Sequence, residues 1–276
     1  MVERVFILQT LCRSNKTAGT AKKISHVMDR WIASRATRLI QEVTAYMDAY
    51  DVVNASRVLM AFVDELSTWY LRESRDRLRD KTTNGEASQV FGWVLLTLAK
   101  LFSPITPFFP ELLYQHLEQV KGESIHLEDW PVADDQYLND ELEKEMGIIR
   151  QSAIEIHAER KAKQIKVRQP LSFASLATTS VVPNSELQKI LSIETNIDRF
   201  EWKVLQNTQK LLLNLNTDIT IGDLRARGEM REVMRVIQDL RKEANVAFDA
   251  YVNVQLPSWP KQFEDMIFCN LEYFLG

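Results

Sequence analysis

Apolar residues recur every three or four positions along the first 165 residues, which is the period of helices that bury one face. This period predicts helices over residues 25–48, about 52–80, 86–102, 111–120 and 139–165. Ser25 is a candidate cap for the first helix. The third helix is apolar almost throughout from Val90 to Leu101, so we expect it to form the buried centre of a bundle.

The pattern changes after Pro170. Short runs that are β-branched or alternate between apolar and polar residues predict strands over 171–178, 200–205, 210–215 and 251–256. Helices are expected over 185–193 and 229–245. Strands mixed with helices and joined by short links imply an α/β or α+β domain. The predicted fold is mainly α, with an antiparallel helical bundle in residues 1–155 and a small mixed α/β domain in residues 156–276.

The composition is that of a globular protein, with 45% hydrophobic and 26% charged residues. No run of about 18 apolar residues is present to span a membrane, and no convincing signal peptide begins the chain. Cys12 and Cys269 lie at opposite ends, which does not fit a disulfide framework or a paired-cysteine metal site. We therefore expect a cytoplasmic protein with no membrane partner.

Charge is unevenly distributed along the chain. The net charge of −4 combines 18 Lys and Arg against 23 Asp and Glu in residues 1–155 (net −5) with 16 against 15 in residues 156–276 (net +1). A polyanionic partner would therefore be bound by local basic patches and not by the field of the whole molecule.

Signatures of catalysis are missing from the sequence. It contains no Gly-rich phosphate loop, no dinucleotide fingerprint, no nucleophile elbow and no paired-histidine zinc motif. The four histidines are scattered, with no carboxylate or cysteine at ligand spacing. We therefore predict no catalytic residue, no metal site and no cofactor site in this chain.

A row of arginines is the first candidate for binding. Arg72, Arg75 and Arg79 fall three and four residues apart, so they share one face of the second helix. Guanidinium groups at helical spacing suit phosphates along a backbone, and Trp69 and Tyr70 beside them would offer a stacking surface. The same spacing also fits a solvated face, with the arginines paired to neighbouring acids and both aromatic residues in the core. Spacing alone favours this second interpretation.

The densest basic cluster lies near the predicted domain boundary, in residues 157–171. Five cations there face a single acid, Glu159, which favours binding of a polyanion. These cations are Arg160, Lys161, Lys163, Lys166 and Arg168. The stretch 225–242 is also basic, but acidic residues nearly balance it, so we interpret it as an ordinary helix surface laced with ion pairs.

Several segments, in order, are shared with one enzyme family. Residues 28–35, MDRWIASR, resemble a helix of class I tRNA synthetases for branched aliphatic amino acids. This helix opens the anticodon-binding domain of those enzymes. The next helix of that domain resembles residues 49–78, including their WY-x-R-x-S-R core. LFSPITPFFPELLYQHL (101–117) and HLEDWP (126–131) follow as in the family. The isoleucyl branch is singled out by QIKVRQPLSFASL, at residues 164–176.

The resemblance implies the anticodon-binding and junction region of an isoleucyl-tRNA synthetase, an enzyme that ligates isoleucine to its tRNA using ATP. Its partners would be isoleucine-accepting tRNA and the remaining domains of the parent enzyme, and we expect a monomer. The catalytic signatures and the editing domain of the family are absent, so ATP and magnesium are expected only in the missing catalytic domain, and this chain alone is predicted to be inactive. The tRNA-binding candidates are Trp69, Arg72, Arg75, Arg79, Lys161, Lys163, Lys166 and Arg168.

Two alternatives stay open. The chain could be a freestanding interaction module derived from a synthetase, which its acidic first half would suit. It could also be the equivalent region of a valyl or leucyl enzyme, which share the earlier motifs more loosely.

Overall fold

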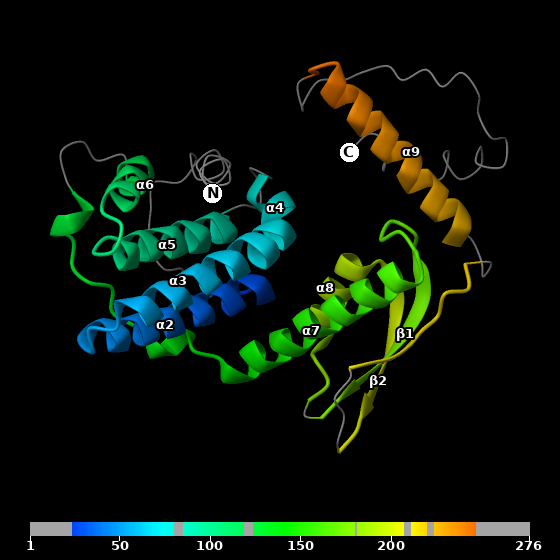
Figure 1. The fold of residues 1–276 in the computed structure, drawn as a ribbon, viewed down its shortest axis with the longest axis horizontal. Helices are drawn as coiled ribbons and strands as arrows, with labels where there is room; N and C mark the ends of the chain where they lie inside the picture. The colour runs from blue at the N-terminus through cyan, green and yellow to red at the C-terminus, as the bar shows by residue number, and fades with distance from the viewer. Residues whose placement is uncertain are drawn as a thin grey trace. The chain divides into compact units, whose positions relative to one another are not determined.

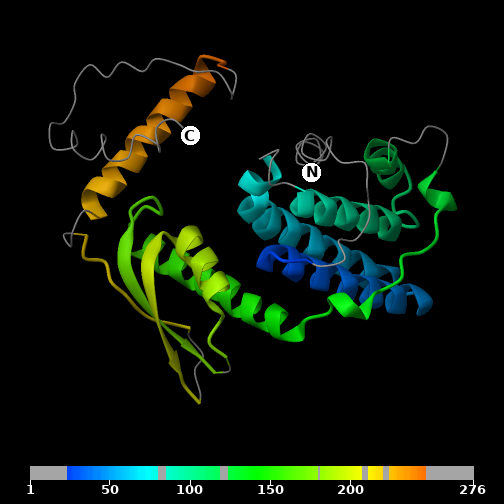
Figure 2. The same ribbon diagram turned by 180° about the vertical axis from the view of Figure 1, so that it is seen from behind.

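The computed structural model describes residues 24–79, 85–118, 124–179, 181–206, 211–219 and 224–246 (Figures 1 and 2). The chain divides into two compact units, Met1–Met146 and Gly147–Gly276. The division falls inside α7 (Asp140–Ala162), and the predicted boundary between residues 155 and 156 lies in the same helix. Helices make up most of the described residues, which confirms the prediction of a mainly α protein.

The first unit is built from long helices. They are α2 (Val27–Asp48), α3 (Val52–Glu65), α4 (Leu71–Arg79), α5 (Gly85–Phe102) and α6 (Phe108–Glu118). α2 packs against α3 and α5, which lie alongside it in both views, and α5 also contacts α6 (Figures 1 and 2). Two short 3-10 turns, Ile125–Leu127 and Asp135–Tyr137, follow α6 in the chain.

α5 lies in the core of the first unit, as its apolar sequence predicts. Val94 and Leu101 are fully buried, and Leu95 and Leu98 are no more than 5% exposed. These four residues share one face of the helix, and further buried residues beside them widen the buried surface, since α5 contacts α2, α3, α4 and α6.

Leu98→Ala should therefore destabilise the first unit. Truncating a buried leucine typically costs about 2–5 kcal/mol, whereas the side chain of Lys144 is exposed. We expect Leu98→Ala to lower the urea midpoint of unfolding clearly and Lys144→Ala to leave it nearly unchanged. Equal and small shifts for the two variants would contradict this placement of the core.

Two helices of the first unit begin differently from the prediction. α2 is capped by His26, whose Nδ1 accepts a hydrogen bond from the amide of Met28 at 3.2 Å. Ser25, the predicted cap, instead donates from its amide and its hydroxyl to the carboxylate of Glu86. α6 begins earlier than predicted because Pro110 falls in its first turn, where no amide donor is needed.

The predicted second helix contains a π turn (Leu66–Tyr70) between α3 and α4. The carbonyl of Leu66 accepts a hydrogen bond from the amide five residues further on, instead of four. Within this turn, the hydroxyls of Ser67 and Thr68 donate to the carbonyl of Asp64 at 3.2 and 2.6 Å. Hydroxyls that bond to the backbone in this way compete with the regular helical ladder. The wider turn shifts the phase of α4 relative to α3.

The second unit contains a three-stranded sheet with β1 (Leu171–Thr178) at its centre. β1 pairs in parallel with β2 (Ile197–Val204) and antiparallel with β3 (Leu212–Leu215). α8 (Ser185–Thr195) connects β1 to β2 and contacts β2. α9 (Leu224–Glu243) follows β3. Three of the four predicted strands and both predicted helices are therefore present.

Asn196 shapes the turn between α8 and β2. Its backbone is left-handed, with φ of 54°, a conformation that asparagine tolerates better than most residues. The side-chain amide donates to the carbonyls of Val167 and Arg168 at 3.0 and 2.9 Å. The turn is thereby tied to the segment that leads into β1.

No helix in the described part of the chain is long and apolar enough to cross a bilayer. The strand predicted over 251–256 and both cysteines, Cys12 and Cys269, lie outside the described residues.

Candidate nucleic-acid interface

The predicted arginine row lies on α4, where Arg72 and Arg75 are exposed; the side chain of Arg79 lies outside the described part of the chain. The guanidinium carbon of Arg72 lies 5.6 Å from the centre of the Trp69 ring, a cation–π contact. Trp69 is only 9% exposed, so Arg72 covers an aromatic ring at the rim of the core. The structure therefore brings Arg72 and Trp69 together and leaves little of the Trp69 ring open for stacking on a base.

Behind this row, a buried carboxylate holds α4 against α2. Asp29 is fully buried and accepts hydrogen bonds from both terminal nitrogens of Arg77, at 2.7 and 2.9 Å. The hydroxyl of Tyr70 donates to the same carboxylate at 2.9 Å, and Arg77 also donates to the hydroxyl of Ser74 at 2.8 Å. Because Arg77 reaches inward, this network fixes the rotation of α4 and with it the outward direction of the arginine row.

The protonation of this network follows from its surroundings. Burial disfavours the charged guanidinium of Arg77. The hydrogen bonds and charge of Asp29 outweigh burial and raise the pKa of Arg77. Burial, followed by the charge of Asp29, raises the pKa of Tyr70 well above its usual value. Both donors therefore keep their protons at neutral pH. Tyr70 is a core residue, as the second interpretation of the row required.

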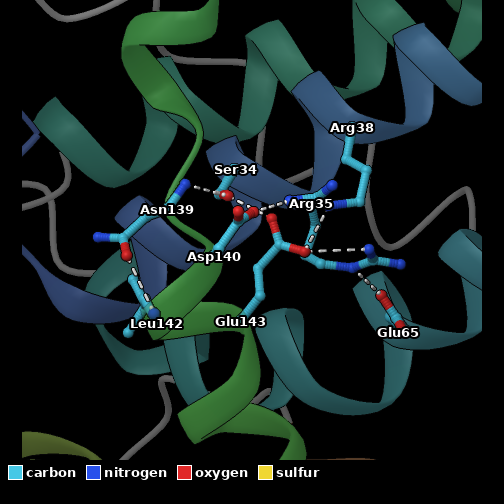
Figure 3. A network of polar contacts seen from close by, with 8 residues as sticks. All are labelled: Ser34, Arg35, Arg38, Glu65, Asn139, Asp140, Leu142 and Glu143. Carbon is cyan, nitrogen blue, oxygen red and sulfur yellow. Dashed lines mark hydrogen bonds and ion pairs between the residues drawn. The ribbon is translucent and has the colours of Figure 1, made fainter.

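A second polar network ties α2 to α3 and to the start of α7 (Figure 3). Arg35 donates to Glu65 at 3.0 Å and to Glu143 at 3.3 Å. Arg38 donates to Glu143 at 2.8 Å, and the hydroxyl of Ser34 also donates to Glu143. Figure 3 shows the carboxylate of Glu143 between Ser34 and the two guanidinium groups. Because these arginines hold helices together, we do not count them as phosphate-binding candidates.

One cation of the basic segment 157–171 is buried. Arg160 is 1% exposed, and its terminal nitrogens donate to four backbone carbonyls at 2.8–3.2 Å. The acceptors belong to Lys166, Gln169, Thr195 and Asn196. Burial lowers the pKa of Arg160 to about 10, which leaves it charged at neutral pH. Arg160 therefore joins the segment before β1 to the end of α8, and its sequence assignment to an exposed cluster is wrong.

The other four cations of this segment are exposed and together form what we call the basic loop. They are Lys161, Lys163, Lys166 and Arg168. Lys163 lies 3.3 Å from Glu159, the acid recognised in the sequence. Lys166 and Arg168 each lie 3.5 Å from Glu232 of α9. Sequence reasoning counted Glu232 among the acids of residues 225–242 but missed its approach to the loop, because more than 60 residues separate the two.

α9 carries the ion pairs that its balanced composition predicts. Arg225 pairs with Glu229 at 3.0 Å, one helical turn away. Arg235 pairs with Glu232 at 3.1 Å and also with Asp239. The acids of α9 therefore lie among its arginines, and its face is not a continuous basic stripe.

Among the described residues, no group of three His, Cys, Asp or Glu side chains is arranged to hold a metal ion. All four histidines have structural contacts: His26 caps α2, and the Nε2 of His157 lies 3.2 Å from Glu194. A ring nitrogen of His116 lies 2.6 Å from the carbonyl oxygen of Leu112, and one of His126 lies 3.3 Å from that of Pro107. The described surface carries exposed cations at the α4 row and at the basic loop.

Comparison with known proteins places the chain in a family. The family model described as the anticodon-binding domain of tRNA ligase matches residues 29–175, more than half of the sequence. The chain therefore belongs to the anticodon-binding domain family of tRNA ligases.

Its curated relatives include many isoleucine–tRNA ligases. The chain is 29% identical to the isoleucine–tRNA ligase of Dehalococcoides mccartyi (strain CBDB1) over 268 residues, which covers 89% of this chain and 26% of that protein. It is 38% identical to the enzyme of Streptomyces coelicolor over 178 residues, covering 62% of this chain and 17% of the relative. With the enzyme of Bacillus thuringiensis it shares 37% identity over 148 residues, covering 52% of this chain and 14% of the relative. The chain thus spans about a quarter or less of the length of these relatives.

Proposed function

We propose that this chain is the part of a cytoplasmic isoleucine–tRNA ligase that holds the anticodon arm of isoleucine-accepting tRNA. The observation that carries the proposal is the family match over residues 29–175, since the α4 row and the basic loop both fall within it. The similarity to isoleucine–tRNA ligases supports the choice of isoleucine. ATP and magnesium would act in the remaining domains of such a ligase, which are the second partner of this chain.

The two basic surfaces would contribute differently to binding. Contacts with phosphates fix the position of a nucleic acid without reading its sequence, whereas unpaired loop bases are read by stacking and by hydrogen bonds to their edges. The flexible lysines of the basic loop suit phosphates as point charges. Arg72 and Arg75, held in a fixed direction by α4, suit the planar recognition of a phosphate or a base edge.

Neutralising the basic loop should weaken the binding of all tRNAs about equally. In a variant with Lys161, Lys163, Lys166 and Arg168 changed to alanine, each lost phosphate contact on a single strand should reduce the slope of log affinity against log salt by roughly 0.7.

Replacing Arg72, Arg75 and Arg79 should reduce the overall affinity for tRNA and, in addition, the preference for the isoleucine anticodon, by about tenfold or about 1.4 kcal/mol. Filter binding between 50 and 200 mM salt, with matched and anticodon-swapped tRNA, measures both quantities.

The control replaces three exposed lysines elsewhere, Lys144, Lys189 and Lys203, which removes a similar charge from other surfaces. Its salt slope and its discrimination should stay close to those of the wild type. An unchanged salt slope in the basic-loop variant would remove that surface from the interface. Unchanged anticodon preference in the arginine variant would reduce the α4 row to a phosphate contact or a solvated face.

A further inference from the structure

Glu232 of α9 lies within reach of three cations, two of which belong to the basic loop. One carboxylate oxygen lies 3.5 Å from Nζ of Lys166 and 3.1 Å from Nη2 of Arg235. The other oxygen lies 3.5 Å from Nη1 of Arg168. A single anion with two outward oxygens thus occupies the space between these cations, as a phosphate group would.

The position of Glu232 is fixed by the way α9 begins. The side-chain amide of Gln169, just after the basic loop, donates to the carbonyl of Leu224 at 2.7 Å. A Cβ at Gly228 would lie 2.2 Å from the Oε1 of the same side chain, so a larger residue there would displace the end of the Gln169 side chain. One turn further along, Arg231 donates to the side-chain oxygen of Asn196. The first turns of α9 are therefore docked on the loop, and Glu232 is held over it.

The contacts of Glu232 are weak enough to be exchanged. The hydrogen bond from Arg235 lowers the pKa of Glu232, so the carboxylate is ionised at neutral pH. Its side chain is 35% exposed, and those of Lys166 and Arg168 are 73% and 51% exposed. Ion pairs this open to solvent contribute little net free energy, whereas phosphates form charge-assisted hydrogen bonds with the same donors. A phosphate can therefore take the place of the carboxylate.

We propose that Glu232 is an internal counter-ion of the basic loop, which an RNA phosphate must displace from Lys166 and Arg168 in order to bind. The inference rests on the proposed function and adds a residue that limits the affinity of this surface for RNA. By competing with every phosphate alike, Glu232 lowers the affinity of the loop for any polyanion. RNA that also contacts other surfaces of the protein stays bound, whereas RNA that contacts it only through phosphates dissociates more readily.

The test is Glu232→Gln, which keeps the shape of the side chain and removes its charge. We expect this variant to bind matched tRNA, anticodon-swapped tRNA and poly(U) on the order of fivefold more tightly at 50 mM salt, since an exposed ion pair amounts to at most about that factor. The salt slope should steepen by roughly 0.7 because one more cation becomes available to RNA. The relative gain should be similar for the three RNAs, because each of them places phosphates on the basic loop.

Glu229→Gln is the matched control, since it removes the same charge from the same helix at a residue that pairs with Arg225 and not with the loop. Its gain should be clearly smaller. In a background with Lys166→Ala and Arg168→Ala, the gain from Glu232→Gln should disappear. Equal gains in the two glutamine variants, or no gain from Glu232→Gln, would overturn the inference. If the wild type shows no preference for isoleucine tRNA while poly(U) still responds to Glu232→Gln, the proposed function fails and the counter-ion stands.

Discussion

Replacing Arg160 with methionine should destabilise the second unit by more than about 3 kcal/mol. Four backbone carbonyls lose the guanidinium donor together in this variant, although those of Lys166 and Asn196 keep a backbone donor. Hydrogen bonds to charged groups contribute about 1.5–3 kcal/mol each. Methionine fills much of the same space, so the loss reports mainly on the hydrogen bonds. Hydrogen exchange of peptides from β1 and α8, followed across a urea series, measures the free energy of unfolding of this unit separately.

Two variants separate the hydrogen bonds from charge alone. Lys161→Met removes one positive charge from the next residue, which is exposed, and should change stability by less than about 0.5 kcal/mol. Arg160→Lys keeps the charge but has a single nitrogen that cannot reach four carbonyls, so it should remain clearly destabilised. If Arg160→Met proves no worse than Lys161→Met, the buried guanidinium is not what joins the segment before β1 to α8.

Replacing Asp29 with alanine should destabilise the first unit by about 3–5 kcal/mol. The change leaves the guanidinium of Arg77 without its buried partner and the hydroxyl of Tyr70 with only the more distant carbonyl of Ala87, at 3.4 Å, as an acceptor. Burial, the largest cause of the raised pKa of Tyr70, remains in this variant, so its hydroxyl stays protonated. The guanidinium of Arg77 loses the partner that offsets its burial, which destabilises the folded state. Urea unfolding, monitored by hydrogen exchange in α2 and α4, gives the free energy.

Two further variants, Tyr70→Phe and Asp76→Ala, should destabilise the first unit less than Asp29→Ala does. Tyr70→Phe deletes only one donor of the network and should cost about 1–3 kcal/mol. Asp76→Ala removes an exposed acid from α4 and should have little effect. If Asp29→Ala behaves like Asp76→Ala, the network does not hold α4 in place. If Asp29→Ala folds well but alters tRNA binding, α4 depends on the network for its direction and not for its stability.

Most helices and strands of this protein follow from its sequence because burial on one face imposes a period that survives in a single chain. The apolar run of α5 and the first strand, β1, were both predicted within a residue or two. The π turn was not predictable, because it arises where Ser67 and Thr68 bond to the backbone within an otherwise helical pattern. The predicted cap of α2 is wrong because Ser25 hydrogen-bonds to Glu86, a residue 61 positions away in the sequence.

The candidate interface was predictable only in part, for a similar reason. Helical spacing was sufficient to place Arg72 and Arg75 on the exposed side of α4. Spacing does not reveal which cation a fold buries, so Arg160 was grouped with its exposed neighbours. Nor does it reveal which acid approaches from elsewhere, as Glu232 does. Long-range ion pairs depend on how α9 docks, through contacts such as those of Leu224 with Gln169 and of Arg231 with Asn196.

The small sheet of the second unit also bears on how the protein behaves when concentrated. Among the described residues, β2 pairs on one side only, with β1. The backbone N–H and C=O groups of its other edge could therefore pair with a strand from another molecule. Charged side chains of alternating sign line β2 and are exposed: Asp198, Arg199, Glu201 and Lys203. A strand from a second molecule would have to desolvate these charges before it could pair, so β2 protects an open edge against aggregation.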